Sequence, residues 1–190
     1  PDYMMLMDTV WDKSKIATNK DIIEFFSKYK PKTLFEPNSK HEYSNTGYAI
    51  LATVIERVSG QTYAEFLKEQ IFKPLKMKSS FVYNRRLSPK EIKKYAFGYL
   101  FIKSLNKYIL PDDYEKTKMV YWLDGVVGDG TVNSTVTDLL KWDRSLYSTK
   151  LVSSESLKEI FANGTLNDGS IGKHSFGWRM LDTKEFGRIA

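Results

Sequence analysis

The stretch His41-Glu42-Tyr43-Ser44-Asn45-Thr46-Gly47-Tyr48 is the most informative part of the sequence, because it leads directly into a long apolar pattern. Tyr43 and Asn45 are two positions apart, so on an extended segment their side chains point to the same side. The following residues predict a helix over residues 48–58 that ends at Gly60. Its apolar positions recur at spacings of three and four: Tyr48, Leu51, Ala52, Ile55 and Val58. The stretch therefore predicts a phenol and a carboxamide that a helix-anchored loop presents to one pocket.

Capping residues and apolar spacing predict further helices. Their start and stop signals are Thr18 (with Asp21) to Lys30-Pro31, Thr62 (with Glu65) to Pro74, Ser134 or Thr135 to Leu146, and Ser153 to Asn163-Gly164. A short helical piece is expected at Ser88-Pro89. The third of these helices is expected to be buried through Val136, Leu139, Leu140, Trp142 and Leu146.

Short strands are expected in two places. Residues 95–102 and 107–110 are expected to be strands, and the turn Ser104-Leu105-Asn106 between them predicts a hairpin. Residues 176–181 read as another strand, whose hairpin partner begins at Arg188. The opening residues 1–10 are apolar and rich in Met, and they have no obvious helix cap. They are expected to be an interior piece of a longer chain.

The composition indicates a folded globular protein, since 42% of the 190 residues are hydrophobic and 14% aromatic. The net charge of +6 invites a nucleic-acid-binding interpretation, but the basic residues are scattered and favour a solvated surface. The absence of cysteine excludes disulfides and thiol catalysis. No apolar run reaches the ~20 residues that a membrane-spanning helix needs, and Pro1-Asp2-Tyr3 does not resemble a signal peptide.

The order of several motifs resembles the serine β-lactamase-related family, which includes class C β-lactamases, D-Ala-D-Ala peptidases and penicillin-binding-protein-like esterases. The motifs are Tyr43-Ser44-Asn45-Thr46-Gly47-Tyr48, Phe72-Lys73-Pro74-Leu75, Gly128-Asp129-Gly130, Ser134-Thr135, Lys141-Trp142-Asp143 and Phe176-Gly177-Trp178. The resemblance implies an α/β sheet domain with an inserted helical domain. The expected class is therefore α+β, mainly α. Residues 1–174 would form the helical domain with small β hairpins, and residues 175–190 the first strands of the α/β domain.

The resemblance also implies acyl transfer through a nucleophilic serine, without a cofactor or metal, on a β-lactam, a D-Ala-D-Ala peptide or an ester. By this resemblance Tyr43 would be the general acid and base, and Asn45 would orient the substrate amide. Gly128, Asp129 and Gly130 would line the substrate cleft. A phenol titrates near ~10, so Tyr43 needs nearby lysines to act as a base at neutral pH. The resemblance alone implies a periplasmic or extracellular location, and the sequence indicates no oligomeric state.

The two other motifs of the family are missing from the expected places. Three S-x-x-K strings occur, at Ser27, Ser104 and Ser170, but none combines the start of a helix with a position well upstream of Tyr43. The K/H-T-G motif is also missing, and His174-Ser175-Phe176-Gly177 matches the segment before it better. The chain is therefore expected to be an interior fragment that is inactive alone.

Plainer interpretations stay open at this point. Tyr43 could be a half-buried aromatic at a helix entry, and Asn45 a helix N-cap. The residues 128–130 could form only a turn. The chain as a whole could be a non-catalytic module that binds a cell-wall peptide or a protein partner in the same cleft.

Overall fold

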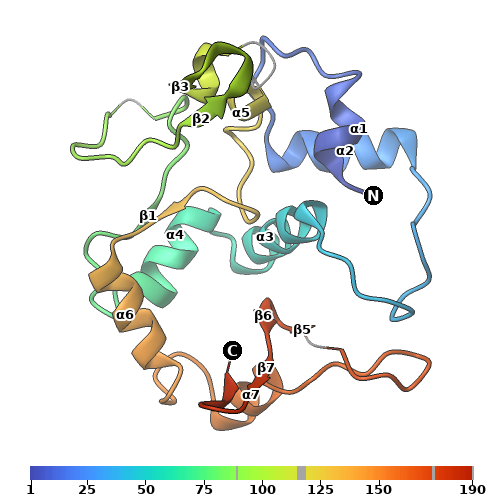
Figure 1. Ribbon diagram of the computed structural model, residues 1–190, viewed down its shortest axis with the longest axis vertical. Helices are drawn as coiled ribbons and strands as arrows, with labels where there is room; N and C mark the ends of the chain where they lie inside the picture. Colours follow the sequence, from blue (N-terminus) through green and yellow to red (C-terminus); the bar gives the residue numbers. More distant parts are fainter. Residues whose placement is uncertain (89, 115–118, 173, 190) are drawn as a thin grey trace. The chain divides into compact units, whose positions relative to one another are not determined.

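The computed structural model describes residues 1–88, 90–114, 119–172 and 174–189 (Figure 1). The described chain is helical with small sheets. The helices are α1 (Tyr3–Asp8), α2 (Asn19–Tyr29), α3 (Asn45–Ser59), α4 (Tyr63–Leu67), the π-helical turn η1 (Lys68–Phe72), the 3-10 turns η2 (Lys103–Leu105) and η3 (Pro111–Asp113), α5 (Met119–Trp122), α6 (Val136–Ser145) and α7 (Ser154–Ile160). The strands form four antiparallel pairs: β1 (Phe81–Val82) with β4 (Val132–Asn133), β2 (Leu100–Ile102) with β3 (Lys107–Ile109), β5 (His174–Ser175) with β6 (Trp178–Arg179), and β7 (Leu181–Thr183) with β8 (Gly187–Ile189).

The chain divides into two compact units, each assembled from separate segments. The first unit comprises Pro1–Pro31, Ser44–Phe66 and Phe81–Asn133, and the second comprises Lys32–Tyr43, Leu67–Ser80 and Ser134–Ala190. The prediction of a helical domain over residues 1–174 followed by strands of an α/β domain at 175–190 stays a prediction.

Three of the predicted start and stop signals are confirmed. Thr18 and Asp21 form a capping box at the start of α2, with the Thr18 amide 2.8 Å from the Asp21 carboxylate. Gly60 ends α3 at φ +70°, a left-handed conformation that glycine adopts without a steric cost. Thr62 and Glu65 bond reciprocally before α4, as the second capping box requires.

The core of the first unit lies between α1, α2 and α3, and α5 with the residues after it adds to it. It consists of the buried residues Tyr3, Met7, Ala17, Ile22, Ala49, Trp122 and Val126. Each large side chain in this set contributes roughly 1.5–3 kcal/mol by leaving water. These contacts hold the start of α3 against the first residues of the chain.

The second unit is built around aromatic stacking and one buried carboxylate. The rings of Trp142 and Trp178 stack with centroids 5.4 Å apart, and Phe161 packs against Trp178. Asp138, only 2% exposed, anchors α6 by accepting hydrogen bonds from residues 79, 80 and 141. Thr135 caps this helix, as one of the two predicted caps.

The predicted buried face of α6 is wrong at three of its five positions. Val136 is 85% exposed, and Leu139 and Leu140 are about half exposed. α6 instead buries Asp138 and Ser145. A buried carboxylate is stable when several donors bond to it. The hydrogen bonds of Asp138 therefore determine which face of α6 is turned inward.

Other boundaries also differ from the prediction. α3 begins at Asn45 rather than Tyr48, because Ser44 caps it there. The hairpin of β2 and β3 is confirmed, although its first strand is shorter than expected. The predicted strand over residues 176–181 divides between β6 and β7, which pair with β5 and β8. Ser88 lies in irregular structure, and Pro89 lies outside the described residues.

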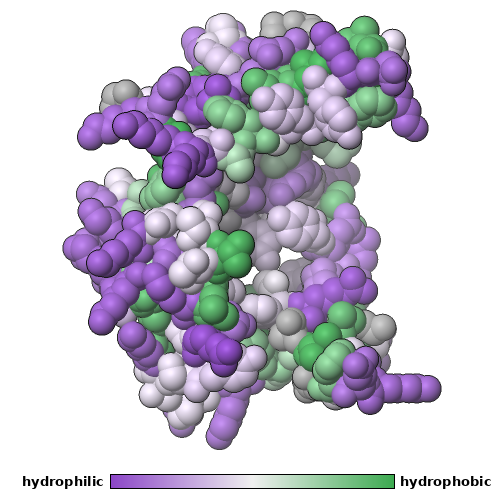
Figure 2. Space-filling model, turned by 60° about the vertical axis from the view of Figure 1, so that its left-hand side comes forward, coloured by the Kyte–Doolittle hydropathy of each residue, from purple (hydrophilic) through white to green (hydrophobic). Residues whose placement is uncertain are grey.

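The exposed surface mixes hydrophilic and hydrophobic side chains on the face that Figure 2 shows. Many large apolar residues are exposed singly, which is common on protein surfaces. Within the described ranges, no helix combines the length and the apolar composition needed to cross a membrane.

Candidate functional site

The start of α3 determines where the predicted site residue Asn45 lies. Ser44 is extended (φ −140°, ψ 106°), and its hydroxyl accepts a hydrogen bond from the Gly47 amide at 3.0 Å. Ser44 is therefore the N-cap, and Asn45 is the first residue of the helix. The alternative that Asn45 itself caps the helix is wrong, because the serine hydroxyl already fills that role. The expectation that Asn45 belongs to an extended segment is wrong for the same reason.

The carboxamide of Asn45 is held by the second residue of the chain. Nδ2 of Asn45 donates to Oδ2 of Asp2 at 2.8 Å, while Oδ1 of Asp2 accepts from the Met4 amide at 2.8 Å. Asp2 thereby caps α1 and contacts the predicted site at the same time. The expectation that residues 1–10 have no helix cap is therefore wrong, and an aspartate directly before an apolar run is a typical N-cap.

Thr46 joins the backbone on both sides of Asp2 to α3 through hydrogen bonds. Its hydroxyl accepts a hydrogen bond from the Tyr3 amide at 2.8 Å and donates to the Pro1 carbonyl at 2.9 Å. Thr46 is 5% exposed, so these hydrogen bonds are largely shielded from water. Both neighbours of Asp2 are therefore fixed on the first turn of α3.

The predicted cleft loop is joined to the same network. The hydroxyl of Tyr3 donates to Oδ2 of Asp129 at 2.7 Å. Burial raises the pKa of Asp129, and the negative charge of Asp2 adds to that shift. Burial also raises the pKa of Tyr3, with a further contribution from Asp129. The phenol therefore stays a hydrogen-bond donor at neutral pH.

Gly128 brings this loop against α3 at very short range. Its φ is +103°, and a Cβ placed there would lie 2.5 Å from the Tyr48 carbonyl oxygen and 2.6 Å from Cβ of Ala52. Only glycine fits this position without displacing the helix backbone. Nothing lies within 4 Å of the corresponding point on Gly130. The structure thus brings Asn45 and Asp129 into one network through residues 1–3.

Tyr43 ends the Lys32–Tyr43 segment of the second unit and is 65% exposed. Within that unit, Asn38 donates to the Thr165 carbonyl oxygen at 3.0 Å, and the rings of His41 and His174 stack with centroids 4.0 Å apart. These contacts anchor the segment that carries Tyr43. Its role as a general acid and base stays a prediction, as does the lining of a substrate cleft by residues 128–130.

The S-x-x-K strings have different local structures. Ser27 lies in the last turn of α2, and Ser104 lies in the 3-10 turn η2. Ser170 lies outside regular structure, and its partner Lys173 is outside the described residues. Neither Ser27 nor Ser104 is at the N-terminal end of an α-helix, where the motif would place its nucleophile.

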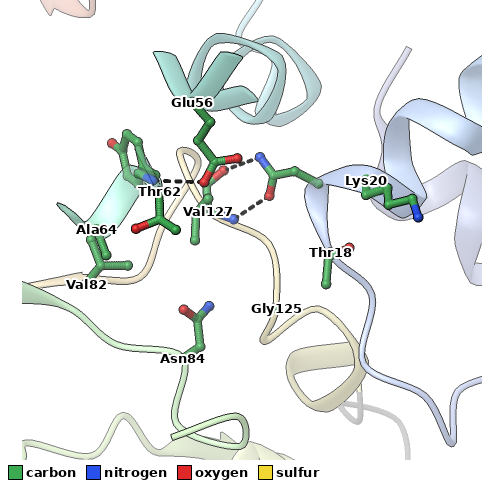
Figure 3. A pocket seen from close by; sticks show the side chains of 11 residues that line it. Thr18, Lys20, Glu56, Thr62, Ala64, Val82, Asn84, Gly125 and Val127 are labelled. Atoms are coloured by element: carbon green, nitrogen blue, oxygen red, sulfur yellow. Dashed lines mark hydrogen bonds between the residues drawn. The ribbon is translucent and has the colours of Figure 1, made fainter. Parts of the chain in front are cut away.

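A cavity of about 290 Å³ opens in the first unit beside α3 and α4 (Figure 3). Glu56 accepts a hydrogen bond from the Tyr63 amide on its wall, and Asn19 bonds both the amide and the carbonyl of Val127. These polar groups are hydrogen-bonded within the protein. None of the predicted site residues lines the cavity. Among the residues that the structure describes, no group of three or more His, Cys, Asp or Glu side chains could hold a metal ion.

Comparison with known proteins gives consistent likenesses. The family model described as Beta-lactamase matches residues 1–187. Penicillin-binding protein 4* of Bacillus subtilis (strain 168) is 44% identical over 189 residues, which is 100% of this chain and 42% of that protein. A D-aminopeptidase of Brucella anthropi is 26% identical over 151 residues, covering 80% of this chain and 26% of that protein. The chain therefore spans less than half the length of either relative.

A solved structure supports the same fold. The penicillin binding protein from Bacillus halodurans matches with a TM-score of 0.74 at 21% identity, over 97% of this chain and 53% of that one. At this identity the likeness concerns the fold alone. It agrees with the expected resemblance to β-lactamase and transpeptidase-like folds.

Proposed function

Because this chain belongs to the β-lactamase family, we propose that it carries the Tyr43-Ser44-Asn45 part of a serine acyl-transfer hydrolase. The observation that supports this most is the family match over residues 1–187, which includes the Y-x-N motif at the entry of α3. The proposed substrates are β-lactams, D-Ala-D-Ala peptides or esters. We propose a periplasmic or extracellular location on the same grounds.

In the proposed reaction a serine hydroxyl attacks the substrate carbonyl and forms an acyl-enzyme, and the amine or alcohol leaves. Tyr43 accepts the serine proton and returns a proton to the leaving group. Asn45 holds the substrate amide beside the reacting carbonyl. Water then hydrolyses the acyl-enzyme and regenerates the serine. The loop 128–130 lines the cleft, and no cofactor takes part.

The nucleophile of this proposal is a serine other than Ser27, Ser104 and Ser170. Ser27 is at the wrong end of α2, and Ser104 is in a 3-10 turn, so neither has a lysine one helical turn further along the start of a helix. We therefore expect a preparation of these 190 residues to hydrolyse neither nitrocefin nor a p-nitrophenyl ester. Turnover above the buffer rate would refute this part of the proposal.

The direct test replaces Tyr43 in the intact protein that carries this chain. Tyr43→Phe removes only the hydroxyl, and kcat/KM should fall about 10²–10⁴-fold because general acid and base catalysis is lost. Tyr147→Phe is a matched control, since Tyr147 is 82% exposed and has no proposed role. If Tyr43→Phe hydrolyses substrate as fast as the control variant, the catalytic assignment is wrong.

The second candidate is a non-catalytic module of the same fold that binds a cell-wall peptide or a protein partner. The positions of Ser27 and Ser104 favour it, because no described S-x-x-K string has the catalytic geometry. An intact protein that binds a D-Ala-D-Ala peptide reversibly and never forms a covalent acyl adduct, as judged by mass spectrometry, would support this candidate.

A further inference from the structure

We propose that Asp2 is a positioning residue that determines which end of the Asn45 carboxamide faces a ligand. The inference rests on the proposed function, in which Asn45 contacts the substrate. It concerns a residue 43 positions away in the sequence, joined to Asn45 by one hydrogen bond of 2.8 Å.

The two oxygens of Asp2 have separate partners. Oδ1 accepts from the Met4 amide and Oδ2 accepts from Asn45, each at 2.8 Å. An ionised carboxylate only accepts hydrogen bonds, so it must face the nitrogen of the carboxamide and not its oxygen. Asp2 therefore selects one of the two orientations that an asparagine side chain can adopt.

The carboxylate cannot easily turn away from Asn45, because the residues on both sides of Asp2 are fixed. The Pro1 carbonyl and the Tyr3 amide both bond the Thr46 hydroxyl, at 2.9 Å and 2.8 Å. Thr46 is the next residue after Asn45 in α3. The hydrogen bonds of Thr46 to residues 1 and 3 therefore keep Asp2 beside Asn45.

The orientation has a consequence for recognition. With Nδ2 turned toward Asp2, the carbonyl Oδ1 of Asn45 is at the opposite end of the carboxamide. Among the described residues, no hydrogen bond uses that oxygen. Asn45 therefore offers the acceptor Oδ1 beside the second N–H of Nδ2, and the ligand group that fits the acceptor is a donor, such as an amide N–H or an ammonium group.

The test uses the isosteric substitution Asp2→Asn to reverse the orientation of the Asn45 carboxamide. In Asp2→Asn the new side chain keeps an oxygen for the Met4 amide and turns its own Nδ2 toward Asn45. Asn45 then rotates and presents its nitrogen outward. In the intact protein, KM for an N-acyl-D-Ala-D-Ala peptide should rise about tenfold with kcat little changed. The analogue N-methylated at the acyl amide lacks the donor, so its KM should not rise.

Three variants separate positioning from helix capping and from net charge. Asp2→Ser keeps an N-cap but is too short to reach Asn45, so it should also raise KM for the N–H peptide. Asp8→Asn loses the same charge from a surface pair with Lys13 and should leave KM unchanged. In Asp2→Asn with Asn45→Asp, the partners are exchanged, and an acceptor again faces outward. This double variant should recover most of the affinity that Asn45→Asp loses.

A spectroscopic measurement checks the orientation without catalysis. The ¹⁵N and ¹H shifts of the Asn45 side-chain amide should change in Asp2→Asn and stay constant in Asp8→Asn. Unchanged shifts, or a KM that rises equally for both peptides, would overturn the inference. If Tyr43→Phe abolishes turnover while Asp2→Asn leaves KM as it was, the inference fails and the proposed function stands. If Tyr43→Phe is fully active, the proposed function itself fails.

Discussion

Asp129 in the first unit and Asp138 in the second are both shielded carboxylates, yet their pKa values shift in opposite directions. Asp129 has the Tyr3 hydroxyl as its side-chain donor, and burial and the charge of Asp2 raise its pKa. Burial also opposes ionisation of Asp138, but Lys141, the Ser79 amide and the Ser80 hydroxyl outweigh it and lower its pKa. Burial opposes ionisation of both carboxylates, and only around Asp138 do the donors, which include a lysine, outweigh it and lower the pKa.

The difference indicates different roles. Asp138 joins α6 to residues 79–80 through an ionised group with three donors, which suits a structural anchor. Asp129 lies in the network of Asp2, Tyr3 and Asn45, where the Tyr3 hydroxyl is its side-chain donor and the charge of Asp2 disfavours its ionisation. Four experiments test whether the two carboxylates differ in this way.

The largest effect is expected from Gly128→Ala, which disrupts the surroundings of Asp129. The new Cβ would lie 2.5 Å from the Tyr48 carbonyl oxygen at φ +103°, so steric overlap and backbone strain add. We expect a loss of about 4 kcal/mol in the free energy of unfolding, measured in urea. Gly130→Ala is the matched control and should cost much less, since nothing lies within 4 Å there. Equal losses would contradict the close packing.

Asp138→Ala should cost somewhat less, about 3 kcal/mol. It removes the acceptor of three hydrogen bonds and leaves the Ser79 amide and the Ser80 hydroxyl without that partner. Asp143→Ala, an exposed position in the same helix, makes the same change of charge. Urea unfolding of both variants measures the difference. A loss no greater than that of Asp143→Ala would show that Asp138 is not an anchor.

Tyr3→Phe should widen the contrast between the two carboxylates. The Tyr3 hydroxyl stabilises the ionised form of Asp129, so its removal should raise the pKa of Asp129 further and leave that of Asp138 unchanged. The free energy of unfolding at neutral pH should fall by about 1 kcal/mol. Carboxyl ¹³C titration by NMR follows both groups, and a lower pKa at Asp129 would be incompatible with the proposed hydrogen bond.

The smallest effect is on the pH dependence of stability. An unfolded aspartate has a pKa of about 3.9. Because the folded pKa of Asp129 is raised, its favourable contribution is complete below about 3.9 and is lost as pH rises through the folded pKa. The folded pKa of Asp138 is lowered, so its contribution is present above about 3.9 and is lost as pH falls through the folded pKa.

Variants isolate these two contributions. Asp129→Asn should remove the decrease in stability above about pH 4, and Asp138→Asn should remove part of the loss below it. Urea unfolding at a series of pH values, with wild type and both variants side by side, measures the slopes. If both variants change the free energy of unfolding on the same side of about pH 4, the pKa values of Asp129 and Asp138 do not shift in opposite directions.

Local signals predicted much of the fold. Thr18 with Asp21, Thr62 with Glu65, and Gly60 depend on atoms within a few residues of each other, and the structure confirms all three. The periodic apolar pattern was less informative for α6, whose orientation depends on residues 79 and 80. Because those contacts join distant parts of the chain, helical spacing could not reveal them.

The family resemblance, the capped helices and the Y-x-N motif that includes Asn45 can be predicted without a structure, because they depend on residue order and local hydrogen bonding. The hydrogen bonds from Asn45 to Asp2 and from Tyr3 to Asp129 can be found only in the folded molecule. These pairs are 43 and 126 residues apart. Packing of α1 against α3 brings Asp2 to Asn45, and the close approach of Gly128 to α3 places Asp129 beside Tyr3, so both hydrogen bonds depend on contacts that no local pattern encodes.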